Sequence, residues 1–187
     1  MSQALASFGR IDIVLANAAM SQAATLQKQS LAEFMAIFNV GFRGTLDLLH
    51  GAWPHLRAQQ YGRVIVTTSS GGRYGNHGLA AYSASKGAIE MLMRSLAAEG
   101  ISRNIRVNAI SPYAATQMTR GHLEPAVASC ITPEAVTPMV AWLASEACRA
   151  NGEVIVAAGG RYRRAYSVET PSVAGDVQVA NAAPSSA

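Results

Sequence analysis

Cysteine, lysine and long apolar runs are scarce in this chain of 187 residues. The two cysteines, Cys130 and Cys148, show no C-x-x-C spacing, so the sequence indicates neither a disulfide framework nor a zinc site. The four histidines are not grouped at the spacing of metal ligands, and we therefore expect no metal. No apolar run approaches the roughly 18 to 20 residues that cross a bilayer, and the amino terminus lacks the pattern of a signal peptide. We expect a cytoplasmic protein without membrane contact.

Charged residues are also few, at 14%, whereas half of the residues are apolar, which is the profile of a folded globular domain with a sizeable core. The formal net charge is +4, but apart from one small group of arginines near residue 163 the cations are scattered. We read this excess as ordinary surface charge and expect no nucleic-acid partner. Only two of the fifteen cations are lysines, Lys28 and Lys86.

The most informative stretch covers residues 64–87, which read VIVTTSSGGRYGNHGLAAYSASKG. Its first residues favour a short buried strand, the glycine-rich residues 71–78 favour a loop, and a helix should follow. Tyr82 and Lys86 would lie in that helix. Four residues are about 400° of rotation and roughly 6 Å of rise, so the phenol and the ammonium should share one face, one turn apart.

This spacing suits acid/base chemistry. A phenol titrates near pH 10, and a neighbouring cation favours the phenolate, which lowers the pKa of the phenol. Ser69 lies at the carboxyl end of the strand, where ligands bind in open α/β sheets, and could hydrogen-bond an oxygen that Tyr82 protonates or deprotonates. The three residues suit the interconversion of an alcohol and a ketone, provided that a hydride carrier is present.

Ser69, Tyr82 thirteen residues later and Lys86 four beyond it resemble the active-site signature of the short-chain dehydrogenases/reductases. The resemblance implies that Tyr82 is the acid/base, that Lys86 holds the nicotinamide ribose, and that Ser69 orients the substrate oxygen. It also implies that Asn39 holds a water that relays protons to Lys86. A narrower resemblance, to the (3R)-hydroxyacyl-CoA dehydrogenase units of multifunctional enzymes, is carried by the strings YGNHG, PYAATQMT and WLASEACRANG.

The same resemblance implies NAD or NADP as cofactor and names contacts for it. Asn17, Ala18 and Ala19 would form the floor beneath adenine and ribose, although the family has glycine where this chain has Ala19. Pro112 and Thr116 would hold the nicotinamide carboxamide, together with Tyr82 and Lys86 at the ribose. The glycines of residues 71–78 would be active-site wall rather than a phosphate cradle, because no acidic residue follows at the required spacing.

Along the rest of the chain, apolar periodicity and capping residues predict alternating strands and helices. We expect a partial doubly wound, Rossmann-like α/β fold, with a parallel sheet of about four strands and helices on both faces. Predicted strands cover residues 11–16, 63–68, 105–110 and 153–158; predicted helices cover 2–8, 30–60, 81–100 and 132–149, with a kink or break at Pro54 and a mobile lid at 119–131.

The family's opening strands, with their T-G-x-x-x-G-x-G pyrophosphate turn, do not occur in these 187 residues. Residues 1–170 would then be the C-terminal part of the domain, and residues 171–187 a disordered tail. Two hypotheses follow: an NAD(P)-dependent oxidoreductase acting on a small alcohol, a ketone or an acyl-CoA, or a non-catalytic truncated remnant that keeps the fold. The resemblance also implies a homo-oligomer through helices 30–60 and 81–100, and we expect the chain by itself to bind NAD(H) or NADP(H) weakly or not at all.

Overall fold

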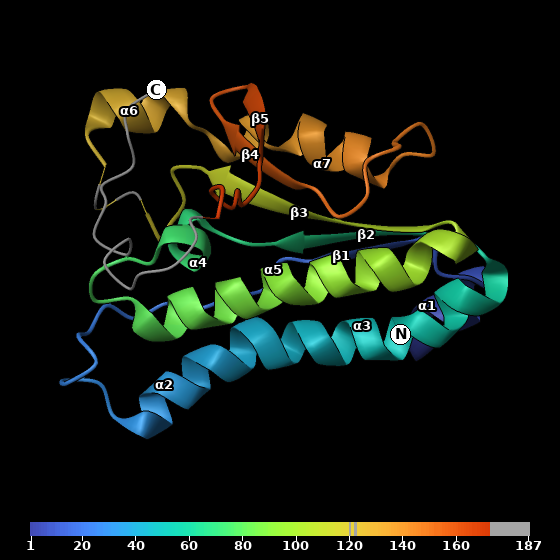
Figure 1. Ribbon diagram of the computed structural model, residues 1–187, viewed down its shortest axis with the longest axis horizontal. Coiled ribbons are helices and arrows are strands. Elements are labelled where there is room, and N and C mark those ends of the chain that lie inside the picture. The colour runs from blue at the N-terminus through green and yellow to red at the C-terminus, as the bar shows by residue number, and fades with distance from the viewer. Residues whose placement is uncertain (120, 122, 173–187) are drawn as a thin grey trace.

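The computed structural model describes residues 1–119, 121 and 123–172, and its strands form one sheet (Figure 1). The strands lie side by side in chain order: β1 (Ile13–Ala16), β2 (Gly62–Thr67), β3 (Ile105–Tyr113), β4 (Val154–Ala158) and β5 (Arg161–Ala165). The first four are parallel, as predicted, which confirms the α/β class. The fifth strand was not predicted; it pairs antiparallel to β4 after a turn in which Gly159 and Gly160 both have positive φ.

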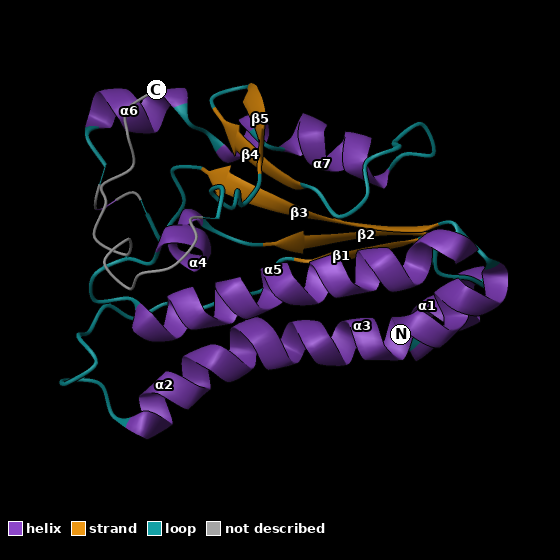
Figure 2. Ribbon diagram, viewed as in Figure 1, coloured by secondary structure: helices purple, strands orange, loops and turns teal. Residues whose placement is uncertain are grey.

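Helices cover both faces of the sheet (Figure 2). The long helices lie on one face and α7 lies on the other. In chain order the helical segments are α1 (Ser2–Phe8), α2 (Leu31–Phe38), η1 (Asn39–Arg43), α3 (Gly44–Gln59), α4 (Ser70–Tyr74), α5 (Ala80–Gly100), η2 (Ile101–Arg103), α6 (Pro125–Cys130), η4 (Pro133–Ala135) and α7 (Thr137–Ala144).

The predicted helix 30–60 is a continuous rod with one irregular turn. Its start is the predicted capping box, because the Ser30 hydroxyl accepts from the Glu33 amide and the Glu33 carboxylate accepts from the Ser30 amide at 2.8 Å. A π-helical turn, η1, separates α2 from α3. The predicted break at Pro54 does not occur, since α3 continues through Pro54 to Gln59.

Two apolar cores lie on opposite faces of the sheet. One packs α3 and α5 against the strands and includes Leu49, Leu56 and Met93. The other lies under α7 and includes Ile65 and Leu143. Only one face of β1 is buried. Val14 and Ala16 point into the first core, whereas the alternate side chains, Ile13 and Leu15, are 52% and 48% exposed.

Two further predictions about secondary structure were wrong. Residues 71–78 are not all loop, because Ser69 caps a short helix, α4, by accepting from the Gly71 amide at 3.2 Å. The predicted helix 132–149 is divided and shorter: a 3₁₀ turn precedes α7, and α7 stops at Ala144. Ser145 is extended, and both its amide and its hydroxyl bind the Trp142 carbonyl, which ends the helix.

Candidate active site

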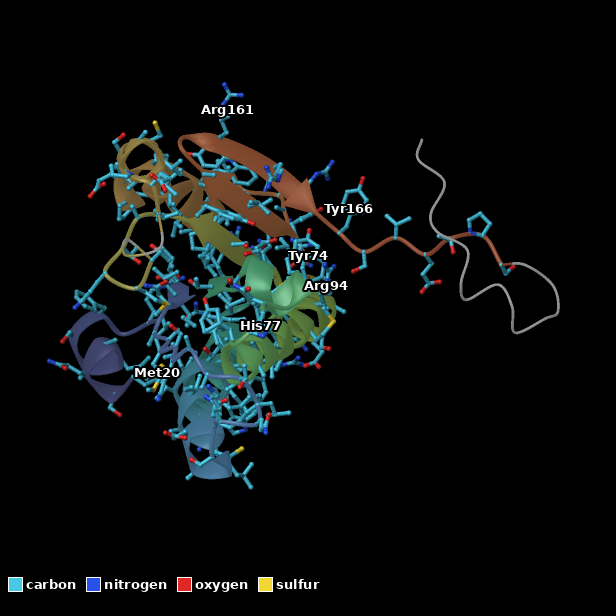
Figure 3. The ribbon with its side chains drawn as sticks, turned by 90° about the vertical axis from the view of Figure 1, so that its left-hand side faces the viewer. Met20, Tyr74, His77, Arg94, Arg161 and Tyr166 are labelled. Atoms are coloured by element: carbon cyan, nitrogen blue, oxygen red, sulfur yellow. The ribbon has the colours of Figure 1, made fainter. Side chains whose placement is uncertain are left out.

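The carboxyl ends of β1, β2 and β3 meet at one edge of the sheet, where ligands bind in open α/β folds. Figure 3 looks onto this edge; Met20, from the segment after β1, lies on one side of His77, and Tyr74 lies on the other. The segments after β1 and β2 are joined there, since the Ala24 amide donates to the Gly78 carbonyl at 2.9 Å and Ala24 bridges to Leu79. The rim of the site is therefore built by two connected loops.

Lys86 is the most deeply buried cation at this edge, with 2% of its surface exposed. Its Nζ donates to the Thr67 carbonyl at 2.6 Å and lies 5.9 Å from the centroid of the Tyr82 ring. Burial lowers the pKa of the Lys86 ammonium to about 8, because the charged form loses hydration. The structure thus holds an ammonium beside the phenol of Tyr82, one turn away on α5.

Ser69 and Tyr82 flank the same glycine. A methyl group placed on Gly71 would lie 3.7 Å from both the Ser69 Oγ and the Tyr82 Cδ1. Both side chains are partly exposed at the open edge. The structure therefore brings Ser69, Tyr82 and Lys86 together, as the spacing of the sequence predicts.

The next glycine lets α4 lie directly against α5. A Cβ on Gly72 would lie only 2.7 Å from the Lys86 carbonyl carbon and 2.8 Å from the Gly87 amide nitrogen. Since backbone atoms cannot move aside as a flexible side chain can, only glycine allows this approach. The close contact sets the position of the Ser69 helix relative to Lys86.

A buried ion pair fixes the same two helices. Arg73 of α4 and Glu90 of α5 lie 3.7 Å apart, with side-chain exposures of 7% and 6%. Glu90 also approaches the guanidinium of Arg94 at 3.3 Å, one helical turn further along α5. Because buried charges are costly unless paired, the pair favours one arrangement of α4 on α5.

Beside these residues lies a cavity of about 340 Å³ between the strand ends and α7. Asn17, Pro112 and Thr116, three of the predicted cofactor contacts, line it. The Asn17 side-chain oxygen accepts from the Thr67 hydroxyl at 2.9 Å, so Thr67 contacts both Asn17 and Lys86. Other lining residues come from β1, β3, the turn after it, η4 and α7: Leu15, Ile110, Ala114, Pro133, Val136, Thr137 and Val140.

The remaining predicted contacts lie at the periphery. Asn39 is the first residue of the π-helical turn, and its side chain is exposed. Ala18 is exposed and Ala19 is half-buried in the loop that follows β1. The π-helical turn itself packs on α5 beside Lys86, since a Cβ on Gly41 would lie 2.8 Å from the Ser85 Oγ.

Comparison with known proteins places this geometry in a family. Residues 1–125 match the family described as short chain dehydrogenase. A short-chain type dehydrogenase/reductase of Mycobacterium tuberculosis is 42% identical over 86% of the chain, and the match covers 56% of that protein. Peroxisomal multifunctional enzyme type 2 of Mus musculus is 39% identical over 84% of the chain, which covers 21% of that protein. A short chain dehydrogenase from Mycobacterium avium superposes with a TM-score of 0.81 at 30% identity, covering 92% of this chain and 60% of that one.

This chain belongs to the short chain dehydrogenase family. It spans little more than half the length of the mycobacterial relative and about a fifth of the mouse one. Within the described part of this short chain dehydrogenase, no group of three or more His, Cys, Asp or Glu side chains is arranged to hold a metal ion. No described helix is long and apolar enough to span a membrane.

Two residues of the candidate site in this short chain dehydrogenase were not predicted from the sequence. Thr67 links Asn17 to Lys86, and the doubled threonine at the end of the strand was the available signal. Thr119 organises the turn after β3: its hydroxyl donates to the Ala114 carbonyl at 2.6 Å and accepts from the Thr116 amide at 2.9 Å. The predicted lid, 119–131, contains α6, and its last residue is tied to the segment after β3, because the Ala115 amide donates to the Ile131 carbonyl at 2.7 Å. Residues 120 and 122, like the predicted tail beyond residue 172, lie outside the described residues.

Proposed function

We propose that this chain is the catalytic part of an NAD(P)-dependent oxidoreductase that interconverts a secondary alcohol and a ketone. The observation that carries the proposal is the buried ammonium of Lys86, 5.9 Å from the Tyr82 ring, with Ser69 on the other side of Gly71. A cation fixed in a poorly solvated site stabilises negative charge on the phenol oxygen when its proton leaves. Membership of the short chain dehydrogenase family supports the reaction class.

Each side chain has a role in this proposal. Tyr82 transfers the proton to or from the substrate oxygen, and the Ser69 hydroxyl orients that oxygen by a hydrogen bond. Lys86 supplies the stabilising charge, and its position is fixed by the Thr67 carbonyl. Asn39 is the exposed first residue of the π-helical turn, and it would hold a water that passes protons between Lys86 and solvent.

The cavity of about 340 Å³ would hold the nicotinamide end of a dinucleotide, and the loop after β1 would lie under its adenosine end. Pro112 and Thr116 would contact the carboxamide, and Asn17, Ala18 and Ala19 would lie beneath the ribose and adenine. Thr67 lines the same cavity and accepts a hydrogen bond from Lys86, so the Lys86 ammonium would donate its other hydrogens to the ribose hydroxyls. A nicotinamide bound there would accept or supply the hydride.

For the substrate we propose acyl-CoA thioesters with a 3-hydroxy or 3-oxo group. The support is the resemblance of the YGNHG, PYAATQMT and WLASEACRANG strings to (3R)-hydroxyacyl-CoA dehydrogenase units, together with the likeness to the mouse multifunctional enzyme. We further propose a homo-oligomer through α2, α3 and α5. Exposed apolar side chains on these helices support it, namely Leu31, Met35, Leu48 and Met91.

The decisive experiment measures binding and turnover separately. Titration of the chain with NAD(H) and NADP(H) reports the affinity, and a screen of 3-hydroxyacyl-CoAs, steroids and small alcohols with both cofactors reports turnover through the absorbance of the reduced nicotinamide. Oxidation of a secondary alcohol by the chain supports the proposal. A folded chain that binds dinucleotide in the low micromolar range, yet turns over no alcohol or ketone, contradicts it.

The alternative is a remnant that retains fold and oligomerising helices but not catalysis. The exposure of Ile13 and Leu15 favours it, because the part of β1 beside the cofactor residues has one uncovered face. In that case the chain elutes as a stable oligomer, and even when joined to a segment with the family's T-G-x-x-x-G-x-G turn it turns over neither alcohols nor ketones.

A further inference from the structure

A second hollow, of about 690 Å³, lies far from Tyr82 between α7, β4 and β5. Arg106 and Glu153 line it at the amino ends of β3 and β4, whereas Pro112 of the first cavity is at the carboxyl end of β3. Six residues of strand separate Arg106 from Pro112, or about 20 Å at the usual rise per residue. The hollow is therefore distinct from the candidate active site.

Three arginines from three different segments converge on it: Arg106 from β3, Arg149 from the segment after α7, and Arg164 from β5. Arg164 pairs with Ile155, which faces α7, whereas its neighbour Arg163 pairs with Val156 and directs its side chain to the other face of the sheet. Arg161, on the same strand, points away from the body of the protein (Figure 3) and does not line the hollow. Convergence from separate elements makes this a built cluster rather than a run of basic sequence.

The positive charge of the cluster is largely uncompensated. Glu153 is the only acidic residue among the described residues that line the hollow, and it pairs with Arg164 at 3.5 Å. Arg106 and Arg149 donate to neutral carbonyls, of Arg149 at 3.0 Å and of Glu146 at 3.4 Å. Neither carbonyl neutralises a charge, so both guanidinium groups remain cationic beside the hollow.

Apart from Asn151, the remaining side chains of the wall are mainly apolar and aromatic. Trp142 and Met139 of α7, Ile101 of η2 and Ile155 of β4 lie there, and Tyr162 of β5 closes one side. The volume falls in the range of small-molecule pockets. Guanidinium groups match phosphate oxygens in a two-pronged geometry, and an indole offers a stacking surface for a planar ring.

We propose that this hollow binds an organic phosphate of nucleotide size, with its phosphates on Arg106, Arg149 and Arg164 and its ring system against Trp142. The site is separate from the dinucleotide contacts at Asn17 and Thr116. It therefore does not depend on the proposed oxidoreductase activity.

Tryptophan fluorescence tests the proposal directly, because the chain has only two tryptophans, Trp53 and Trp142. In a Trp53→Phe background, Trp142 reports the hollow alone. We expect ADP to change its fluorescence saturably, and pyrophosphate to bind at least about tenfold more weakly because it cannot use the apolar wall. Arg149→Gln with Arg164→Gln should weaken ADP binding by at least about tenfold, because two of the three guanidinium groups that face the phosphates lose their charge.

The matched control is Arg43→Gln with Arg57→Gln, two exposed arginines on the rod far from the hollow. This control and Asn17→Ala should each leave the Trp142 titration unchanged within about twofold, the latter because it affects only the first cavity. Any of three results would overturn the proposal. These are equal losses of ADP affinity in both arginine pairs, equal affinity for ADP and pyrophosphate, and a Trp142 fluorescence signal that Asn17→Ala abolishes. Self-association that the Arg149 and Arg164 changes abolish while no ADP titration saturates would overturn it too, because it would make the hollow a contact between copies.

Discussion

The two sides of the candidate active-site edge differ in how well the rest of the described chain buries their residues and fixes their positions. On the side of α4 and α5, Lys86, Glu90 and Arg73 are buried, and glycine contacts hold the two helices together. On the side of β1, Asn17 and Ala18 are exposed, and the strand before them shows Ile13 and Leu15 to solvent. The difference teaches that the proposed acid/base residues are positioned by contacts within this chain, whereas the residues proposed to contact the cofactor are only partly supported by it. The following predictions test that difference.

The largest effect is expected from Tyr82→Phe. In any form of the protein that turns over substrate, loss of the phenol hydroxyl should lower kcat by about 10² to 10⁴, the usual contribution of a positioned acid/base. The affinity for dinucleotide should change little, because the ring remains. Steady-state kinetics and a binding titration separate the two quantities. A variant with nearly normal kcat removes the assignment of Tyr82.

Next in size is the ion pair between α4 and α5. Glu90→Leu should lower the free energy of unfolding by about 3 kcal/mol, because it leaves the Arg73 charge buried without its partner. The double change, Arg73→Met with Glu90→Leu, should recover most of that loss. Urea unfolding of the four proteins gives the coupling energy. Simple additivity of the two single changes would show that the pair does not hold the helices together.

Burial of Lys86 should make the free energy of unfolding depend on pH, with a change comparable in size to that expected for the ion pair. The folded Lys86 pKa of about 8 lies below the unfolded value of 10.5, so the unfolded chain binds more protons between those values. The cost of burying the ammonium is therefore complete below pH 8 and declines as the pH rises to about 10.5. Relative to Lys86→Met, the native chain should gain up to about 3 kcal/mol of stability across this window. Parallel stability profiles for the two proteins would contradict the shift.

A somewhat smaller effect is expected from Gly72→Ala. The added methyl would overlap the backbone of Lys86 and Gly87, and we expect a loss of about 1–3 kcal/mol in the free energy of unfolding. Gly44→Ala is the matched control. Its Cβ would meet only the Asn39 carbonyl at 3.8 Å within a helix, so stability should be unchanged or slightly raised. Equal outcomes for the two variants would mean that α4 can shift freely on α5.

The smallest effects distinguish the two faces of β1. Val14→Ala removes a side chain that is 5% exposed and should cost about 1–2 kcal/mol. Leu15→Ala, on the open face of the same strand, should cost less than about 0.5 kcal/mol. Thermal or urea unfolding compares them. If Leu15→Ala proved the more costly, this face would be covered in solution, by another copy or by further chain.

Much of the fold could be predicted from the sequence because strand runs and capping residues are local signals. The box of Ser30 and Glu33 and the spacing of Tyr82 and Lys86 are examples. β5 could not, because the exposed string RYRRA has no apolar pattern and depends on pairing with β4. The burial of Arg73 and Glu90 was also unpredictable, since it follows from the close approach of α4 to α5 at Gly72, which no local sequence pattern specifies. The roles of Ser69, Asn39 and the cofactor contacts stay predictions.

The wide turn at Asn39–Arg43 has a consequence for the shape of the rod that contains it. A π turn holds more residues per revolution than an α turn, so the side chains beyond it are rotated about the axis relative to those before it. The first segment of the rod accordingly leans on α5, whereas the second directs Leu49 and Leu56 to the sheet. One continuous rod thereby packs against two different neighbours, and the change of partner occurs at the turn whose Gly41 lies against Ser85, next to Lys86 in the sequence.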